Sequence, residues 1–287
     1  MRPHDPEERM KRIHLFEIED FSWFPGWLRA CMTRLIVVMH RALGTREALV
    51  ELIARALKES NTSNIVDLCS GSGGPMIDVV RILREKPGLE GIQLTLTDLY
   101  PSMEAAELIN NQEGSNVSYR TSPVDATKID GEIAGSTGVA GLPGLRTMVS
   151  SFHHMRPDDA RKILESVQRS RQPICIFEIS DNSHPLLLGW LALPINFVMC
   201  LLITPLARPM TVRQLVFTYI VPIIPLCFAW DGAVSNARTY TLDDLDELLS
   251  GLRDEEYRWE KGVIGGRAKK LYLLGIPNRE AGASASG

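Results

Sequence analysis

The stretch that decides the fold is Ile65-Val66-Asp67-Leu68-Cys69-Ser70-Gly71-Ser72-Gly73-Gly74-Pro75. An apolar run that ends in an acid is followed by a glycine-rich turn, and Pro75 stands at the expected start of a helix, where proline is favoured. Glycines let the backbone adopt positive φ values and approach a ligand closely, and the start of a helix offers free N–H groups. The stretch therefore predicts an α/β protein that holds part of a nucleotide-like ligand at the carboxyl end of a strand.

Outward from this stretch, short β-branched runs alternate with helical segments. This alternation predicts a parallel sheet with helices on both faces. The predicted strands are 64–68, 92–98, 117–120, 146–151 and 173–179, and the predicted helices are 75–86, 101–112 and 157–169. A helix over 241–252, with Thr241 and Asp244 spaced as in a capping box, precedes a hairpin of 257–264 and 269–275. We predict a doubly wound, Rossmann-like α/β sheet of seven strands with a C-terminal antiparallel hairpin.

The spacing of the glycines distinguishes between the classes of ligand that such a turn can bind. A dinucleotide site would need a third glycine at position 76, where Met76 stands, and a phosphate-binding P-loop would need a lysine that is not there. The acid before the turn and the G-x-G instead resemble motif I of the class I S-adenosylmethionine-dependent methyltransferases, D/E-x-G-x-G-x-G. Asp67, Gly71 and Gly73 match this motif, and Cys69 replaces its first glycine.

Two further strand ends follow the same family pattern. Asp98, in Leu96-Thr97-Asp98-Leu99, stands where the family has an acid for the two ribose hydroxyls, and a carboxylate offers two acceptor oxygens to such a diol. Pro123-Val124-Asp125-Ala126 resembles the family's adenine-contacting turn, although Asp125 taken alone also suits a helix cap or a turn. The cofactor-binding residues that the resemblance implies are Asp67, Cys69, Gly71, Ser72, Gly73, Asp98, Leu99, Asp125, Ala126 and Ser150.

The fourth predicted strand ends in Ser150-Ser151-Phe152-His153-His154-Met155, where the family places residues that face the transferable methyl group. A hydroxyl or carbon acid benefits from a base with a pKa near 7, which is the range of histidine. We therefore predict His153 or His154 as the base, the alternative being a histidine that only hydrogen-bonds the backbone. Glu178, at the end of the fifth strand, is a third catalytic candidate, with a solvated loop acid as the alternative.

The segment between the fifth strand and the last helix is unusually apolar. From Pro185 to Trp230 the only charged side chains are Arg208 and Arg213, and six prolines interrupt the segment. The uncharged run from 186 to 207 is long enough to span a bilayer, but its prolines favour a lid or a monotopic surface that dips into one leaflet. An apolar substrate chamber and a buried homodimer interface remain as alternatives.

The resemblance implies an enzyme that transfers a methyl group from S-adenosyl-L-methionine. The apolar insertion favours a small hydrophobic acceptor, such as a lipid, a quinone, an isoprenoid or an aromatic metabolite. The alternative is a non-catalytic S-adenosylmethionine-binding protein that acts as a membrane or protein interaction module. A net charge of −4 and the lack of an N/D-P-P-Y/F signature argue against nucleic acid as a partner. Since no two cysteines have C-x-x-C spacing, we assign no metal ligands.

The predicted organisation has an N-terminal helical cap over 1–60, a methyltransferase domain over 61–184 and 231–279, the apolar insertion over 185–230 and a flexible tail over 280–287. The cap contains an aromatic run, 16–27, that we expect either to cover the pocket or simply to pack on the sheet. Residues 1–12 are charged and lack the apolar core of a secretory signal. With five scattered cysteines, this predicts a cytoplasmic protein, placed at the membrane surface if the insertion binds lipid.

Overall fold

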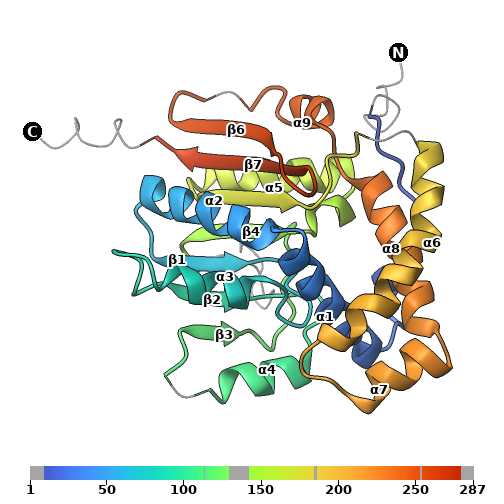
Figure 1. The fold of residues 1–287 in the computed structure, drawn as a ribbon. Helices are drawn as coiled ribbons and strands as arrows, with labels where there is room; N and C mark the ends of the chain where they lie inside the picture. Colours follow the sequence, from blue (N-terminus) through green and yellow to red (C-terminus); the bar gives the residue numbers. More distant parts are fainter. Residues whose placement is uncertain (1–9, 113, 129–141, 184–185, 253, 279–287) are drawn as a thin grey trace, which may run out of the picture.

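The computed structural model describes residues 10–112, 114–128, 142–183, 186–252 and 254–278. Seven strands form one mixed sheet in the order β3-β2-β1-β4-β5-β7-β6, which Figure 1 shows from β6 at the top to β3 at the bottom. The strands are β1 (Asn64–Asp67), β2 (Gln93–Leu96), β3 (Val117–Tyr119), β4 (Leu145–Val149), β5 (Ile174–Glu178), β6 (Tyr257–Ile264) and β7 (Lys270–Pro277).

The direction of the strands explains where a ligand binds. Strands β1 to β5 pair in parallel, whereas β7 runs antiparallel to both β5 and β6. The strand order reverses between β1 and β4, and ligands of open α/β sheets bind outside the carboxyl ends of the strands at such a switch point. The predicted doubly wound sheet of seven strands with a C-terminal antiparallel hairpin is confirmed.

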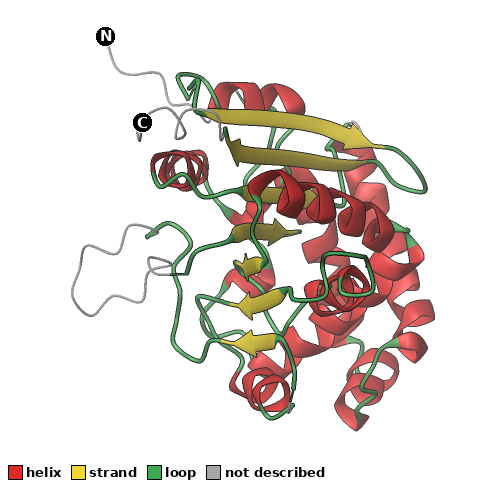
Figure 2. Cartoon of the chain, turned by 90° about the vertical axis from the view of Figure 1, so that its left-hand side faces the viewer, coloured by secondary structure: helices red, strands yellow, loops and turns green. Residues whose placement is uncertain are grey.

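Helices cover both faces of the sheet, as Figures 1 and 2 show. One face packs against α2 (Thr45–Ser60), α3 (Met76–Leu83) and α4 (Met103–Asn110), and the other packs against α5 (Pro157–Arg169) and α9 (Leu242–Leu248). Strand β5 shows the alternation that makes this possible: Cys175 and Phe177 enter the first core, while Ile174 and Ile176 enter the second. A parallel sheet needs such cover because it is apolar on both sides.

A third group of helices lies beyond the carboxyl ends of the parallel strands, at the right of Figure 1. It consists of α1 (Gly26–Ala42), α6 (Leu186–Ile203), the short α7 (Val212–Leu215), a π-helical turn (Val216–Ile220) and α8 (Ile223–Arg238). Leu35 of α1, Cys200 of α6 and Phe228 of α8 share one apolar core. Helix α1 of the predicted cap therefore packs with the insertion, whereas α2 packs on the sheet. Helix α8 continues without a break past the domain boundary predicted at residue 231.

Several element ends differ from the sequence-based expectation for local reasons. The helix predicted from position 101 begins at Met103, because the Ser102 side chain accepts a hydrogen bond from the Ala105 N–H and caps it. The capping box predicted at Thr241 and Asp244 is confirmed. The tail predicted over 280–287 lies outside the described residues.

Within the part of the chain that the structure describes, no single helix is long and apolar enough to cross a bilayer. The uncharged run that begins at position 186 ends as a helix at Ile203 and passes into a 3-10 turn, Thr204–Leu206. One pair of segments, Val212–Ile220 and Ile223–Arg238, is long and apolar enough when taken together, but the two are bent by 80° from one another.

Candidate active site

The glycine-rich turn after β1 adopts the backbone conformation that its sequence requires. Gly71 and Gly73 have φ values of +57° and +111°. A Cβ atom at Gly73 would lie 2.8 Å from Cδ1 of Ile77, so a side chain there would push the end of the Ile77 side chain aside. Cys69, which stands where the motif has its first glycine, also has a positive φ of +57°. The cysteine therefore keeps the left-handed conformation for which glycine is otherwise favoured.

Asp67 is turned into the protein, where it holds this turn in place. Its Oδ1 accepts a hydrogen bond of 2.5 Å from the Thr147 hydroxyl, and its Oδ2 accepts one of 2.7 Å from the Ser70 hydroxyl. Burial raises the pKa of Asp67 to about 7, against the lowering effect of the two hydroxyls. The carboxyl group thus positions the loop, and a direct role in binding a ligand stays a prediction.

Asp98 joins the second strand end to the glycine turn. Its Oδ2 accepts a hydrogen bond of 2.7 Å from the Gly71 N–H, and its Oδ1 accepts one of 2.8 Å from the Tyr100 N–H. Its backbone carbonyl accepts from the Val124 N–H at 2.8 Å. The structure therefore brings the turn after β1, the acid after β2 and the predicted adenine-contacting turn to one edge of the sheet. Burial raises the pKa of Asp98.

The other predicted cofactor residues differ from one another in exposure and in location. Leu99 is exposed and Ala126 is buried. Asp125 Oδ1 accepts from both the backbone N–H and the hydroxyl of Thr127, as expected of an acid that stabilises a turn. Ser72 lines a separate cavity between α1, α3 and α4. Their contacts with a cofactor stay predictions.

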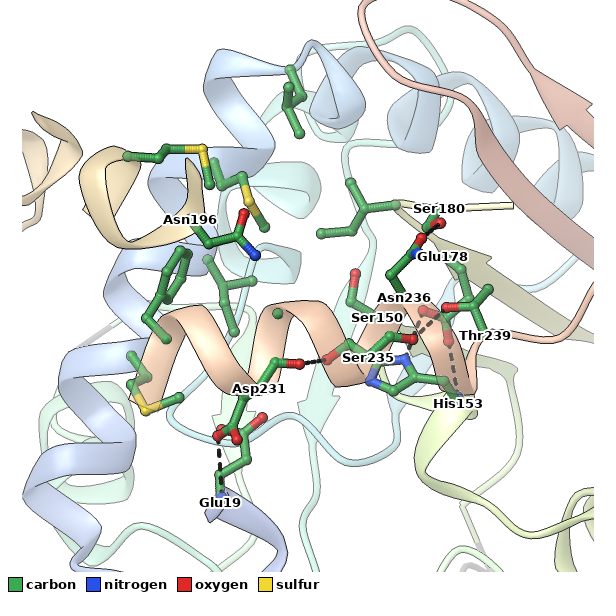
Figure 3. A pocket seen from close by; sticks show the side chains of 18 residues that line it. Glu19, Ser150, His153, Glu178, Ser180, Asn196, Asp231, Ser235, Asn236 and Thr239 are labelled. Carbon is green, nitrogen blue, oxygen red and sulfur yellow. Dashed lines mark hydrogen bonds and ion pairs between the residues drawn. The ribbon is translucent and has the colours of Figure 1, made fainter. Parts of the chain in front are cut away.

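A cavity of about 220 Å³ lies at the carboxyl ends of β4 and β5, beneath α1, α6 and α8 (Figure 3). Its wall is largely apolar. Its polar side chains come from the strand ends, the N-terminal segment and α8, and Figure 3 shows Asp231 and Glu19 at one end and His153 and Glu178 at the other. Three predicted site residues line it together, namely Ser150, His153 and Glu178.

Both histidines are oriented by carboxylates. His153 Nδ1 lies 2.9 Å from Glu178 Oε2, and Glu178 Oε1 accepts from the His153 backbone N–H. His154 Nδ1 lies 2.7 Å from Asp20 Oδ1. The Nε2 atoms of both rings face the buried carboxylate of Glu17, at 3.6 Å and 3.7 Å respectively.

The charges around these histidines are matched by a buried arginine. Arg238 Nη1 lies 2.6 Å from Asp20 Oδ2 and 3.1 Å from Glu17 Oε1. Burial lowers the pKa of His154, but the carboxylates of Glu17 and Asp20 outweigh it and raise this pKa to about 9. With these partners His154 keeps its proton at neutral pH, which makes His153 the better candidate for accepting one.

Sequence reasoning did not single out three residues of this region as site residues, namely Glu17, Asp20 and His40. Their roles depend on contacts between distant segments. The acids Glu17 and Asp20 lie within the aromatic run 16–27, where acids among aromatic residues were an available signal. His40 lies in the largely apolar helix α1. It contacts the Ser150 hydroxyl through Nε2, at 3.2 Å, and the Thr45 hydroxyl through Nδ1, at 2.7 Å.

Comparisons with known proteins give resemblance at the level of structure alone. No family model matches the sequence, and no curated protein matches it. Solved structures similar to the chain include the plantazolicin methyltransferase BpumL in complex with SAH (11% identity, 88% of this chain and 98% of that chain, TM-score 0.48). The chain is also similar to human N-acetylserotonin methyltransferase in complex with SAM (15% identity, 84% of this chain and 58% of that chain, TM-score 0.43). A third similar structure is that of the S-adenosylmethionine-dependent methyltransferase SibL (12% identity, 81% of this chain and 57% of that chain, TM-score 0.42).

These solved structures are methyltransferases, the kind of protein that the sequence motifs resemble. Their identities are 15% or lower and their TM-scores are below 0.5. We therefore base the functional proposal on the residues and the geometry of this chain.

The buried Asp67 predicts a specific dependence of stability on pH. Its pKa is raised from 3.8 to about 7 by folding, so its protonated form stabilises the fold below pH 3.8 and this contribution is lost as the pH rises through 7. The loss is on the order of 4 kcal/mol, at about 1.36 kcal/mol per pKa unit. The difference in melting temperature between the wild type and the Asp67→Asn variant should decrease as the pH is raised from 4 to 7. The exposed Asp246→Asn is the control, and a difference that does not change with pH would contradict the assignment.

Proposed function

We propose that the protein transfers a methyl group from S-adenosyl-L-methionine to a small hydrophobic acceptor held in the cavity at the ends of β4 and β5. The observation that carries this proposal is the position of that cavity. It lies at the same edge of the sheet as the glycine turn, and Ser150, which follows β4, lines it. A cofactor at the switch point and an acceptor in the cavity would then be neighbours.

The residues at the strand ends fit the proposed cofactor. Gly71 and Gly73 adopt the positive φ values that let a glycine turn follow the end of β1, as the proposed cofactor site requires. Asp98 lies beside Gly71 with a carboxylate that suits the vicinal hydroxyls of a ribose. S-adenosylmethionine, when bound, supplies an electrophilic methyl group on a sulfonium. The chain then has to hold the acceptor in line with that group and to exclude water.

The cavity suits an acceptor with an apolar body and one polar group. Its apolar lining comes from α1, α6 and α8, and includes Met32, Ile36, Met39, Met199 and Phe228. At the other end Glu178 fixes the ring of His153 through Nδ1, which directs the Nε2 lone pair away from that carboxylate. We propose that this lone pair serves to activate the polar group of the acceptor.

The cofactor assignment predicts the effect of Asp98. The Asp98→Asn variant keeps one acceptor oxygen for the N–H groups of Gly71 and Tyr100 but loses the second oxygen and the charge. Charge-assisted hydrogen bonds contribute about 1.5–3 kcal/mol. Isothermal titration with S-adenosylmethionine should therefore show a dissociation constant that is raised by about tenfold or more. Asp246→Asn, at an exposed site, should leave binding unchanged. An unaltered dissociation constant in a folded Asp98 variant would remove this residue from the site.

The catalytic assignment predicts a separation of binding from turnover. The His153→Ala variant should bind S-adenosylmethionine as the wild type does but lose about 10²–10⁴-fold in turnover. Transfer of a radioactive methyl group to a panel of phenols, quinols and isoprenoid alcohols measures this loss. Cofactor binding by the wild type without transfer to any member of the panel would favour a non-catalytic binding protein instead.

We also propose that the insertion contacts an anionic lipid surface, so that the enzyme works on the face of a membrane. Residues of the insertion with apolar side chains in water include Ile195, Leu202, Val212, Ile220 and Leu226. The only charged residues between 186 and 230 are the two arginines, at positions 208 and 213, and both are exposed. An apolar surface with basic residues beside it has the chemistry of a segment that lies in a membrane interface.

Liposome flotation tests the lipid proposal. The double variant Leu202→Asp and Ile220→Asp should lose at least tenfold in its partition onto vesicles of phosphatidylcholine and phosphatidylglycerol, because charges are costly at membrane depth. Leu108→Asp, an exposed leucine on α4, is the matched control and should float as the wild type does. A wild type that stays in solution as a dimer, and dissociates in the double variant, would assign the same surface to a second copy of the chain and overturn the lipid proposal.

A further inference from the structure

Glu17, His153 and His154 bring three metal-ligating atoms together beside the cavity. One carboxylate oxygen and the two imidazole nitrogens lie within 4.8 Å of one another. The residues come from the N-terminal segment and from the 3-10 turn Phe152–His154 that follows β4. Since His153 also lines the cavity, this cluster is one side chain away from the proposed acceptor.

The cluster contains buried polar atoms that lack hydrogen bonds. Among the described residues, neither carboxylate oxygen of Glu17 nor Nε2 of His153 has a hydrogen-bond partner, and both side chains are buried. Arg238 Nη1 forms an ion pair with Glu17 Oε1 at 3.1 Å, but the same nitrogen also serves Asp20. A buried carboxylate is costly unless it is paired, hydrogen-bonded or bound to a metal. The arginine meets this need only in part.

Both rings are held in the orientation that metal-ligating histidines have. Each Nδ1 lies within hydrogen-bond distance of a carboxylate, that of Glu178 for His153 and that of Asp20 for His154. A carboxylate that accepts from Nδ1–H leaves Nε2 to the ion, which at His154 has to displace the proton that this ring keeps at neutral pH. Metal-bound histidines almost always donate the other ring N–H to a carboxylate, a backbone carbonyl or water. Both Nε2 atoms point to the same carboxylate, that of Glu17.

The distances between the two Nε2 atoms and the Glu17 carboxylate fit a bound ion better than direct hydrogen bonds. The separations of 3.6 Å and 3.7 Å between the Nε2 atoms and the oxygens of Glu17 are too long for hydrogen bonds. Ligands that each lie about 2.1 Å from one ion in tetrahedral geometry are roughly 3.4 Å apart. The three ligand atoms lie within 4.8 Å of one another, so the side chains would have to draw together by up to about 1.4 Å to close this site around an ion.

We propose that Glu17, His153 and His154 form a binding site for a divalent first-row transition metal ion. Two imidazoles and one carboxylate are a donor set for Zn²⁺ and its neighbours, whereas Mg²⁺ and Ca²⁺ prefer sites made of oxygen ligands. Three protein ligands leave one or more positions open, as in catalytic sites. An ion bound to Nε2 of His153 would replace this nitrogen as the group that activates the acceptor, by polarising an oxygen of the acceptor. That role rests on the proposed methyl transfer, but the binding of the ion does not. The sequence analysis assigned no metal ligands.

Metal binding by the full chain, stripped with a chelator beforehand, tests the proposal. Titration with Zn²⁺ should show one site of micromolar or tighter affinity. The Glu17→Gln, His153→Gln and His154→Gln variants should each lose at least 100-fold, and His14→Gln, outside the cluster, should bind as the wild type does. Titration with Co²⁺ should give the visible bands of nitrogen and oxygen ligation without the charge-transfer band of a thiolate, which separates this site from the five cysteines.

The orienting carboxylates provide a second, milder set of variants. Asp20→Asn and Glu178→Gln keep all three ligands and should weaken binding by about 10–100-fold. Zn²⁺ should also raise the melting temperature of the wild type, because an ion that binds only the folded state stabilises it. This measurement needs no variant to fold.

Three outcomes separate this proposal from the proposed function. A wild type that neither binds Zn²⁺ or Co²⁺ nor gains thermal stability from them would overturn the metal site. Binding that the three ligand variants retain would overturn it as well. Methyl transfer would then stand, with His153 as a simple base. Metal binding at the three proposed ligands in a chain that does not bind S-adenosylmethionine would overturn the proposed function and leave the metal site in place.

Discussion

The buried ion pairs of Arg238 are the interaction on which the rest of this site depends. Arg238 lies at the end of α8 and is almost fully buried, and a buried guanidinium needs acidic partners. It finds them in Glu17 and Asp20 of the N-terminal segment. Arg12 extends this link, because its Nε donates to the carbonyl of Arg238 and its Nη2 donates to the carbonyl of His153. The end of α8, the turn after β4 and the N-terminal segment are thereby held together.

This link fixes the position of α1, and with it the shape of both cavities. Asp231 on α8 accepts from the backbone N–H groups of Ile18 and Glu19, so the segment before α1 is tied to α8 at a second place. Helix α1 then crosses the carboxyl edge of the sheet, where Met32 lines one cavity and Thr33 lines the other. A helical cap held only by apolar packing would have no such definite direction.

Local patterns sufficed to predict the sheet but not the charged cluster. The strands, the hairpin and the capping box at Thr241 depend on neighbours in the sequence, and these agree with the structure to within a few residues. The order of Asp67, Asp98 and Asp125 along the chain also predicted that their strand ends meet at one edge. Glu17 and Arg238 are more than 200 positions apart, and no periodicity within either segment indicates that they pair. The chemical difference between Asp67 and Asp98 likewise appears only when their hydrogen-bond partners are known.

The apolar insertion presents one apolar surface to the cavity and another to the outside of the molecule. Helix α6 is apolar on all sides, and such a helix has to be covered all round. Asn196, Met199 and Cys200 face inward, where they contact the cavity and the core shared with α1 and α8. Ile195, Val198 and Leu202 lie on another side of the helix, at i, i+3 and i+7, and are exposed. The inner side provides the apolar wall of the cavity, and the outer side is the part of the lipid-facing surface that we propose. A hydrophobic acceptor that partitions into a bilayer would then reach the cavity past the same helix that holds the enzyme at the membrane.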